Sequence, residues 1–198
     1  PATSMDLRHT IGLLDALTPE DWGEGEAPQD GLPTCLAEDI ARYGLSWFKI
    51  KINGQKEADV KRLLAIAEVL HACGVNDPRF TLDGNEQFTS MNDLADTLEE
   101  VVTHPQGAAL FEGLAFIEQP ISRKDTFRSE LHAGLSRVRA FGPVIIDEAD
   151  FGVQAFPDAV SLGYEGVSVK ACKGVFRALL NRGLCETSPG KLFQSGED

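Results

Sequence analysis

Charged residues end several short apolar segments of this chain. Asp83, Glu118 and Asp147 each follow a run of apolar residues, and Lys49 and Lys51 end the run before them. Charged side chains are rarely buried unless they are paired or bind a metal. Three carboxylates on neighbouring strands suit a hard divalent cation such as Mg²⁺, which prefers oxygen ligands. These types and positions therefore predict a metal centre with lysines beside it.

The lysines suggest proton transfer. Lys49 and Lys51 alternate with apolar residues, so both project from the same side of one strand. Because two ammonium groups on one face repel each other, we expect the pKa of each to be lowered, and such a lysine accepts a proton near neutral pH. Lys170 ends a strand four places further on, across a barrel mouth from Lys51. Two such bases would serve opposite faces of one substrate carbon.

The spacing of these residues indicates the elements that position them. From Lys51 to the three acids and then to Lys170, the steps are 32, 35, 29 and 23 residues. One strand–helix–strand unit takes about 30 residues, so each step advances by one strand. In a (β/α)₈ barrel the carboxyl ends of all strands meet at one mouth, where catalytic residues lie. An open doubly wound sheet is the alternative, but the chain lacks the GxGxxG turn of dinucleotide-binding sheets.

The hydrophobic pattern predicts about seven strand-first units in order, and therefore an α/β chain with a parallel sheet and crossover helices. The expected strands are 7–17, 45–52, 79–83, 114–118, 144–147, 166–170 and 192–195. The expected helices are 33–43, 55–73, 91–102, a stretch within 126–138, a short one near 153–162, and 175–184.

Composition excludes several classes of protein. With 18 basic and 31 acidic residues the net charge is −13, which argues against binding to nucleic acid or to anionic lipid. No apolar run approaches the ~20 residues that cross a bilayer. The four cysteines are scattered without zinc-binding spacing, so we expect reduced thiols and a cytoplasmic protein.

Five motifs carry a resemblance to a known family. They are KIK at 49–51, LDGNE at 82–86, IEQP at 117–120, IIDEA at 145–149 and VSVKACKG at 167–174. In this order and at this spacing they resemble the barrel domain of the enolase superfamily, and within it the muconate-lactonizing-enzyme branch of the mandelate racemase/muconate lactonizing enzyme family. The resemblance runs from Leu7 to Ser195 and implies a modified TIM barrel.

The resemblance also implies a role for each matching residue. Asp83, Glu118 and Asp147 are similar to the three Mg²⁺ ligands of the family, with Mn²⁺ as an expected substitute. Lys51 and Lys170 are similar to its two acid/base catalysts.

Further positions match the surroundings of that site. Lys49 resembles the lysine that neutralises the substrate carboxylate and lowers the pKa of its neighbour. Asn85 matches a residue that approaches substrate or metal, and Glu148 resembles a partner of the third metal ligand. On the sixth strand Lys173 is the alternative to Lys170, which we prefer because it ends the strand itself.

The chain also departs from the family pattern. Family members carry a capping domain and an eighth strand, and neither is found between residues 1 and 198, so we expect a single, partial barrel domain from a longer protein. Seven strands would leave two unpaired edges. The mandelate-racemase branch places a His–Asp pair on the sixth and seventh strands, and Lys170 argues against that branch.

The implied activity is Mg²⁺-dependent removal of the α-proton of a small carboxylate substrate through a stabilised enediolate. Racemisation or epimerisation would make the protein an isomerase, and β-elimination would make it a lyase that dehydrates, or a cycloisomerase. We also expect a homo-oligomer. Two alternatives stay open: a catalytically silent barrel used for binding or assembly, and an aldolase that uses Lys170 as a Schiff base. The aldolase leaves the acids unexplained.

Overall fold

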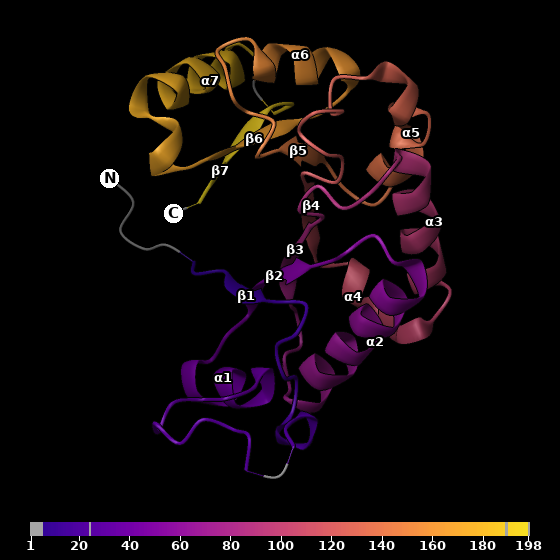
Figure 1. The fold of residues 1–198 in the computed structure, drawn as a ribbon, viewed down its shortest axis with the longest axis vertical. Coiled ribbons are helices and arrows are strands. Elements are labelled where there is room, and N and C mark those ends of the chain that lie inside the picture. Colours follow the sequence, from indigo (N-terminus) through magenta and orange to yellow (C-terminus); the bar gives the residue numbers. More distant parts are fainter. Residues whose placement is uncertain (1–5, 24, 189, 198) are drawn as a thin grey trace.

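The computed structural model describes residues 6–23, 25–188 and 190–197. Within them seven parallel strands form one curved sheet in chain order (Figure 1). The strands are β1 (His9–Ile11), β2 (Trp47–Lys51), β3 (Arg79–Asp83), β4 (Leu114–Glu118), β5 (Val144–Ile146), β6 (Gly166–Val169) and β7 (Phe193–Gly196). β1 and β7 each pair with one strand only, so the sheet is an incomplete TIM barrel, as predicted.

Helices connect the strands and lie outside the curve of the sheet (Figure 1). The α-helices are α1 (Leu36–Tyr43), α2 (Lys56–Ala72), α3 (Met91–Val102), α4 (Pro105–Phe111), α5 (Leu135–Arg139), α6 (Ala155–Leu162) and α7 (Val175–Thr187). Three 3₁₀ turns are η1 (Pro19–Asp21), η2 (Ser129–His132) and η3 (Ala171–Lys173).

The core lies between the sheet and the helices, and strand alternation decides which side chains enter it. In β3 the ring of Phe80 faces the helices and meets Phe111 of α4 edge-on, with 5.6 Å between ring centroids. Thr81 and Asp83 therefore project to the other, concave side. Phe116 of β4 also lies on that side, where its ring is 5.6 Å from that of Phe193 in β7. Contact between strands so far apart in the sheet shows how strongly the sheet curls.

The strand register places charged side chains at one level. Lys51 of β2 is the partner of Asp83 in β3, and Asp83 is the partner of Glu118 in β4. Glu118 in turn pairs with Ile145 of β5, so Asp147 comes just beyond the end of that strand. The predicted position of charged residues at the carboxyl ends of the strands is confirmed, with Lys51, Asp83 and Glu118 at one level and Asp147 two residues further along.

The first predicted strand, 7–17, is wrong in length. β1 ends at Ile11 because Asp15 folds back and its carboxylate accepts a hydrogen bond of 2.6 Å from the amide of Gly12. The amides of Leu17 and Thr18 then bind the carboxylate of Asp21. These side-chain hydrogen bonds replace the strand ladder, which is the usual effect of aspartates in turns.

Two helical regions also differ from prediction. The stretch within 126–138 splits into η2 and α5 at Gly134, where a Cβ atom would lie 2.6 Å from the amide nitrogen of Asn92. α4 was not predicted, although Pro105 stands at its start, a position that proline favours. Its seven residues are too few to show a clear helical period.

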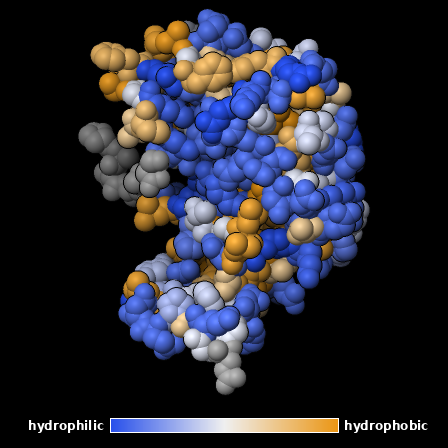
Figure 2. Space-filling model, in the orientation of Figure 1, coloured by the Kyte–Doolittle hydropathy of each residue, from blue (hydrophilic) through white to orange (hydrophobic). Residues whose placement is uncertain are grey.

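Apolar side chains are exposed around α7. They are Phe151, Val153, Val175, Phe176, Leu179 and Leu180. Figure 2 shows apolar residues at the upper edge of the molecule, where α6 and α7 lie. No helix in the described part of the chain is long and apolar enough to cross a membrane.

Candidate active site

Lys49 lies at the centre of the first group of site residues. Its Nζ is 2.9 Å from Oδ2 of Asp83, 2.9 Å from Oε2 of Glu118 and 3.0 Å from Oε2 of Glu197, which follows β7. Lys51 also contacts Asp83, with 2.6 Å between Nζ and Oδ2. Strands β2, β3 and β4 thus bring together four of the predicted residues.

Glu118 is the acid with the poorest compensation in this group. Its side chain is fully buried, and neither carboxylate oxygen has a hydrogen-bond partner, because the approach of Lys49 is close without being directed along a hydrogen bond. Burial, and then the negative charge of Asp83, raise the pKa of Glu118 to about 8. A buried carboxylate of this kind needs more positive charge than the chain provides.

Asp147 is the centre of a second group, at the ends of β5 and β6. Its Oδ1 accepts a hydrogen bond from the hydroxyl of Ser168 and lies 2.9 Å from Nζ of Lys173, and its Oδ2 accepts a hydrogen bond from Lys170. Burial opposes the charged form, but these donors outweigh it and lower the pKa of Asp147. The third predicted acid is therefore fully compensated.

The expected lowering of the pKa of Lys49 is wrong. Burial alone would lower the pKa of Lys49, but the charges of Glu118 and Asp83 outweigh it and raise that pKa. In the same way the hydrogen bond to Asp147 raises the pKa of Lys170 against the effect of burial. The prediction counted the like charge on the same strand and left out acids on neighbouring strands, which lie closer.

Asn85 and Glu148 lie between the two groups. The amide nitrogen of Asn85 donates a 2.9 Å hydrogen bond to Oδ1 of Asp83, and its side chain donates one of 3.4 Å to Oε1 of Glu148. Asn85 adopts a φ of 40°, in the left-handed region that asparagine tolerates. Burial, and then the charge of Asp147, raise the pKa of Glu148.

Three residues of the site were missed. Gln119 is buried, and its Oε1 accepts hydrogen bonds from the amides of Asp147 and Ala149, which ties β4 to the loop after β5. Ser168 binds Asp147 as described above. Glu197 pairs with Lys49 and Arg8, and the signal that revealed the other acids, a charged residue ending a strand, was available for it too.

The three acids predicted as metal ligands, Asp83, Glu118 and Asp147, are not arranged around a common point. Among the described residues no three His, Cys, Asp or Glu side chains are placed together as a metal site. Lysine ammonium groups stand beside the carboxylates instead, so the site residues form one group around Lys49 and another around Asp147.

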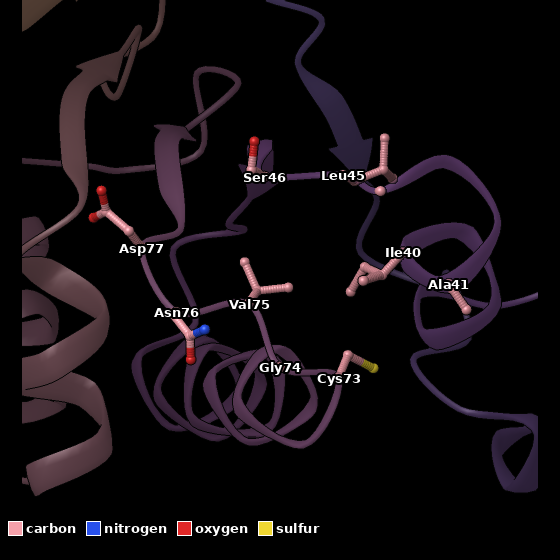
Figure 3. Close-up of a pocket in the computed structure, with 10 residues that line it drawn as sticks. Ile40, Ala41, Leu45, Ser46, Cys73, Gly74, Val75, Asn76 and Asp77 are labelled. Atoms are coloured by element: carbon pink, nitrogen blue, oxygen red, sulfur yellow. The ribbon is translucent and has the colours of Figure 1, made fainter.

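A cavity of about 480 Å³ lies elsewhere, between α1 and the end of α2 (Figure 3). It is lined by segments that precede β2 and β3, including Ser46 and Asp77. It therefore opens near the amino ends of these strands, away from the acids at their carboxyl ends, and it contains none of the predicted site residues.

No family model matches the chain. A curated relative, the hydrophobic dipeptide epimerase of Enterococcus faecalis, is 28% identical over 165 residues, which cover 79% of this chain and 41% of the relative. The solved structure of a dipeptide epimerase from the same species is 25% identical with a TM-score of 0.58, and the match covers 82% of this chain and 43% of that one. The chain thus spans less than half the length of these proteins.

A second solved structure has the family name that the motifs suggested. It is the mandelate racemase/muconate lactonizing protein of Paracoccus denitrificans, complexed with magnesium. It is 16% identical with a TM-score of 0.58, and the match covers 82% of this chain and 42% of that one. The predicted resemblance to enolase-type barrels of this group is confirmed.

Proposed function

We propose that this chain carries the acid/base site of a Mg²⁺-dependent isomerase that removes the α-proton of a small carboxylate substrate. The observation that carries the proposal is the buried Glu118, whose carboxylate oxygens accept no hydrogen bond and have only the shared Lys49 as a charged neighbour, beside Asp83 and Lys51. The similarity to a dipeptide epimerase supports an isomerase ahead of a lyase.

The donor set suits a magnesium ion. Asp83, Glu118 and Asp147 provide carboxylate oxygens on three successive strands, and oxygen is the ligand that Mg²⁺ prefers. The unpartnered oxygens of Glu118 mark the place where a cation would be most stabilising. When bound, the ion supplies a Lewis acid that stabilises negative charge on the substrate carboxylate. Mn²⁺ is the proposed substitute.

Lys51 and Lys170 must separate from their acid partners before either can act as an acid/base catalyst. Lys51 contacts Oδ2 of Asp83, and Lys170 contacts Oδ2 of Asp147. A lysine separated from its acid loses the ion pair that stabilises its ammonium form and is then free to approach the substrate. Under this proposal Lys51 and Lys170 then exchange protons with opposite faces of the substrate α-carbon.

Lys49 has a different role in this proposal. It is the most enclosed of the three predicted lysines, with an exposed side-chain fraction of 8%, against 24% for Lys51 and 23% for Lys170. A buried ammonium with three acids around it stays charged and is poorly placed to lose a proton. We assign it to the electrostatic stabilisation of the substrate carboxylate as negative charge develops there.

The name of the curated relative suggests the substrates to test first. The chain is incubated in deuterated water with Mg²⁺ and a panel of hydrophobic dipeptides, and α-proton exchange is followed by NMR. We expect exchange with at least one dipeptide, its loss when EDTA is added, and its loss in Glu118→Gln. Glu68→Gln makes the same chemical change at an exposed position of α2 and should keep the exchange. No exchange with any dipeptide would favour a different carboxylate substrate class.

A silent, binding-only barrel is the second candidate. The observation that favours it is the lysine compensation of Asp83 and Asp147, which needs no metal. Mg²⁺ titration separates the two candidates, because a silent barrel has no reason to bind the ion at Glu118. Binding that is lost in Glu118→Gln supports the enzyme.

A further inference from the structure

Lys173 is the most restrained cation of the group around Asp147. Its Nζ donates hydrogen bonds of 2.8 Å to the backbone oxygen of Asp147, 3.0 Å to the backbone oxygen of Ser168 and 2.8 Å to Oγ of Ser168. These three bonds use all three protons of the ammonium group. The side chain is 12% exposed, about half the value for Lys170.

Lys173 and Lys170 hold different oxygens of the same carboxylate. Nζ of Lys173 lies 2.9 Å from Oδ1 of Asp147, and the Ser168 hydroxyl that accepts from Lys173 donates to that same oxygen. Lys170 binds Oδ2. One oxygen is therefore held from two directions, while the other is held by the more exposed lysine.

The segment that carries Lys173 is itself fixed. The amide of Lys173 donates a 3.0 Å hydrogen bond to the backbone oxygen of Lys170, which closes η3. Asp150, a buried acid after β5, has its Oδ2 at 3.8 Å from Nζ of Lys173 and accepts a hydrogen bond from Arg177 on its backbone oxygen. β5, η3 and α7 thus meet around this lysine.

We infer that Lys173 is a positioning residue that fixes the carboxylate of Asp147, and that Lys170 is the lysine free to leave it. This inference rests on the proposed function, because it treats Asp147 as a metal ligand. Movement of the Lys173 ammonium away from Asp147 would break three partly buried hydrogen bonds. The side chain of Lys170 has a hydrogen bond only to Asp147 within the described residues, so its release breaks a single bond.

Isothermal titration of Mg²⁺ into the full chain tests the inference, with Lys173→Met and Lys170→Met compared. Each substitution removes one positive charge beside Asp147, so any gain in metal attraction is shared by the two variants. We expect Lys170→Met to bind Mg²⁺ at least as tightly as the unchanged chain. We expect Lys173→Met to bind about 10-fold more weakly than Lys170→Met, because Asp147 is no longer held in place.

A second variant keeps the test decisive if Lys173→Met does not fold, which circular dichroism would show. Ser168→Ala removes the hydroxyl that joins Lys173 to Asp147 and leaves the charge unchanged, and it should weaken Mg²⁺ binding by about 3- to 10-fold. Equal Mg²⁺ affinity in the two lysine variants, or unchanged Mg²⁺ affinity in Ser168→Ala, overturns this inference and leaves the proposed metal centre standing. Failure of the unchanged chain to bind Mg²⁺ overturns the proposed metal centre and this inference with it.

Discussion

The two halves of the candidate site balance their buried charges in opposite ways. Around Lys49, at the ends of β2, β3 and β4, a single buried ammonium is shared by three acids, and Glu118 is left without a hydrogen bond. Around Asp147, at the ends of β5 and β6, a single acid is shared by two lysines and a serine. In the first half Lys51 and Arg8 pair with the other two acids, so Glu118 alone depends on the shared Lys49, whereas Asp147 has two lysines of its own.

This difference shows where a cation would gain most. An added positive charge beside Glu118 meets a buried carboxyl group whose pKa stays raised despite the nearby Lys49, so binding relieves an existing electrostatic cost. The same charge beside Asp147 must compete with lysines that already lower the pKa of that acid. We therefore expect residues of the β2–β4 half to contribute most of the metal affinity. Residues of the β5–β6 half should contribute less, because a cation there must compete with the lysines.

The largest expected effect comes from Glu118→Gln. The change keeps the shape of the side chain and removes a carboxylate ligand, so Mg²⁺ affinity measured by calorimetry should fall by about 100-fold or more. The metal-free variant should be at least as stable as the unchanged chain in urea at neutral pH, because the raised pKa of Glu118 shows that folding disfavours its ionised form. Clear destabilisation would show that the charge of Glu118 is well compensated after all.

The two acid/base lysines give the next largest effect. In Lys51→Ala and Lys170→Ala, net epimerisation of a true substrate should fall by about 10²- to 10⁴-fold. Each variant should still exchange the α-proton of one stereoisomer in deuterated water, and the two should prefer opposite stereoisomers. Exchange of the same stereoisomer by both variants would mean that all proton transfer takes place on one face of the α-carbon, which contradicts the proposed roles of the two lysines.

The sequence alone was sufficient to predict most of the strands and helices that position the β2–β4 half. β3, α3 and β4 begin and end where the pattern predicted, because their apolar periodicity is strong and ends at a charged or polar residue. The level of Asp83 and Glu118 followed from unit spacing, since parallel strands in chain order bring successive ends together. These features depend on local pattern and on topology.

The balance of charge in the two halves could not be predicted in the same way. Whether Glu118 accepts a hydrogen bond depends on the direction from which Lys49 approaches it, and residue spacing does not contain that direction. The raised pKa of Lys49 depends on distances to acids on other strands, which one-dimensional spacing does not contain. The positioning role of Gln119 depends on a buried contact across β4 and β5.

Gln119 connects the two halves, and its removal should have a moderate effect. In Gln119→Leu the amides of Asp147 and Ala149 lose their acceptor, and a buried unsatisfied amide is destabilising by about 1–3 kcal/mol. We expect the free energy of unfolding in urea to fall by about that amount. Gln106→Leu, at an exposed position of α4, is the matched control. Equal stability of the two variants would mean that the halves are held together by packing alone.

The smallest effect concerns two loops of the β2–β4 half, which follow β3 and β4. Arg123 donates hydrogen bonds of 2.6–3.0 Å to the carboxylate of Glu86 from its side chain, and these contacts lower the pKa of Glu86. A carboxylate with a lowered folded-state pKa stabilises the fold above its unfolded pKa of about 4.3. That stabilisation is lost as the pH falls through the lower folded-state value.

Arg123→Gln should therefore be less stable than the unchanged chain at pH 7 by about 0.5–1 kcal/mol, since the arginine is half-exposed and solvent weakens the pair. The difference in unfolding free energy should shrink as the pH is lowered from 5 to 3, because the glutamate is then protonated in both proteins. Lys124→Gln removes the same charge one position along, at an exposed residue, and should show little of this pH dependence. A difference that persists at pH 3 would mean that Arg123 stabilises these loops through packing instead of charge.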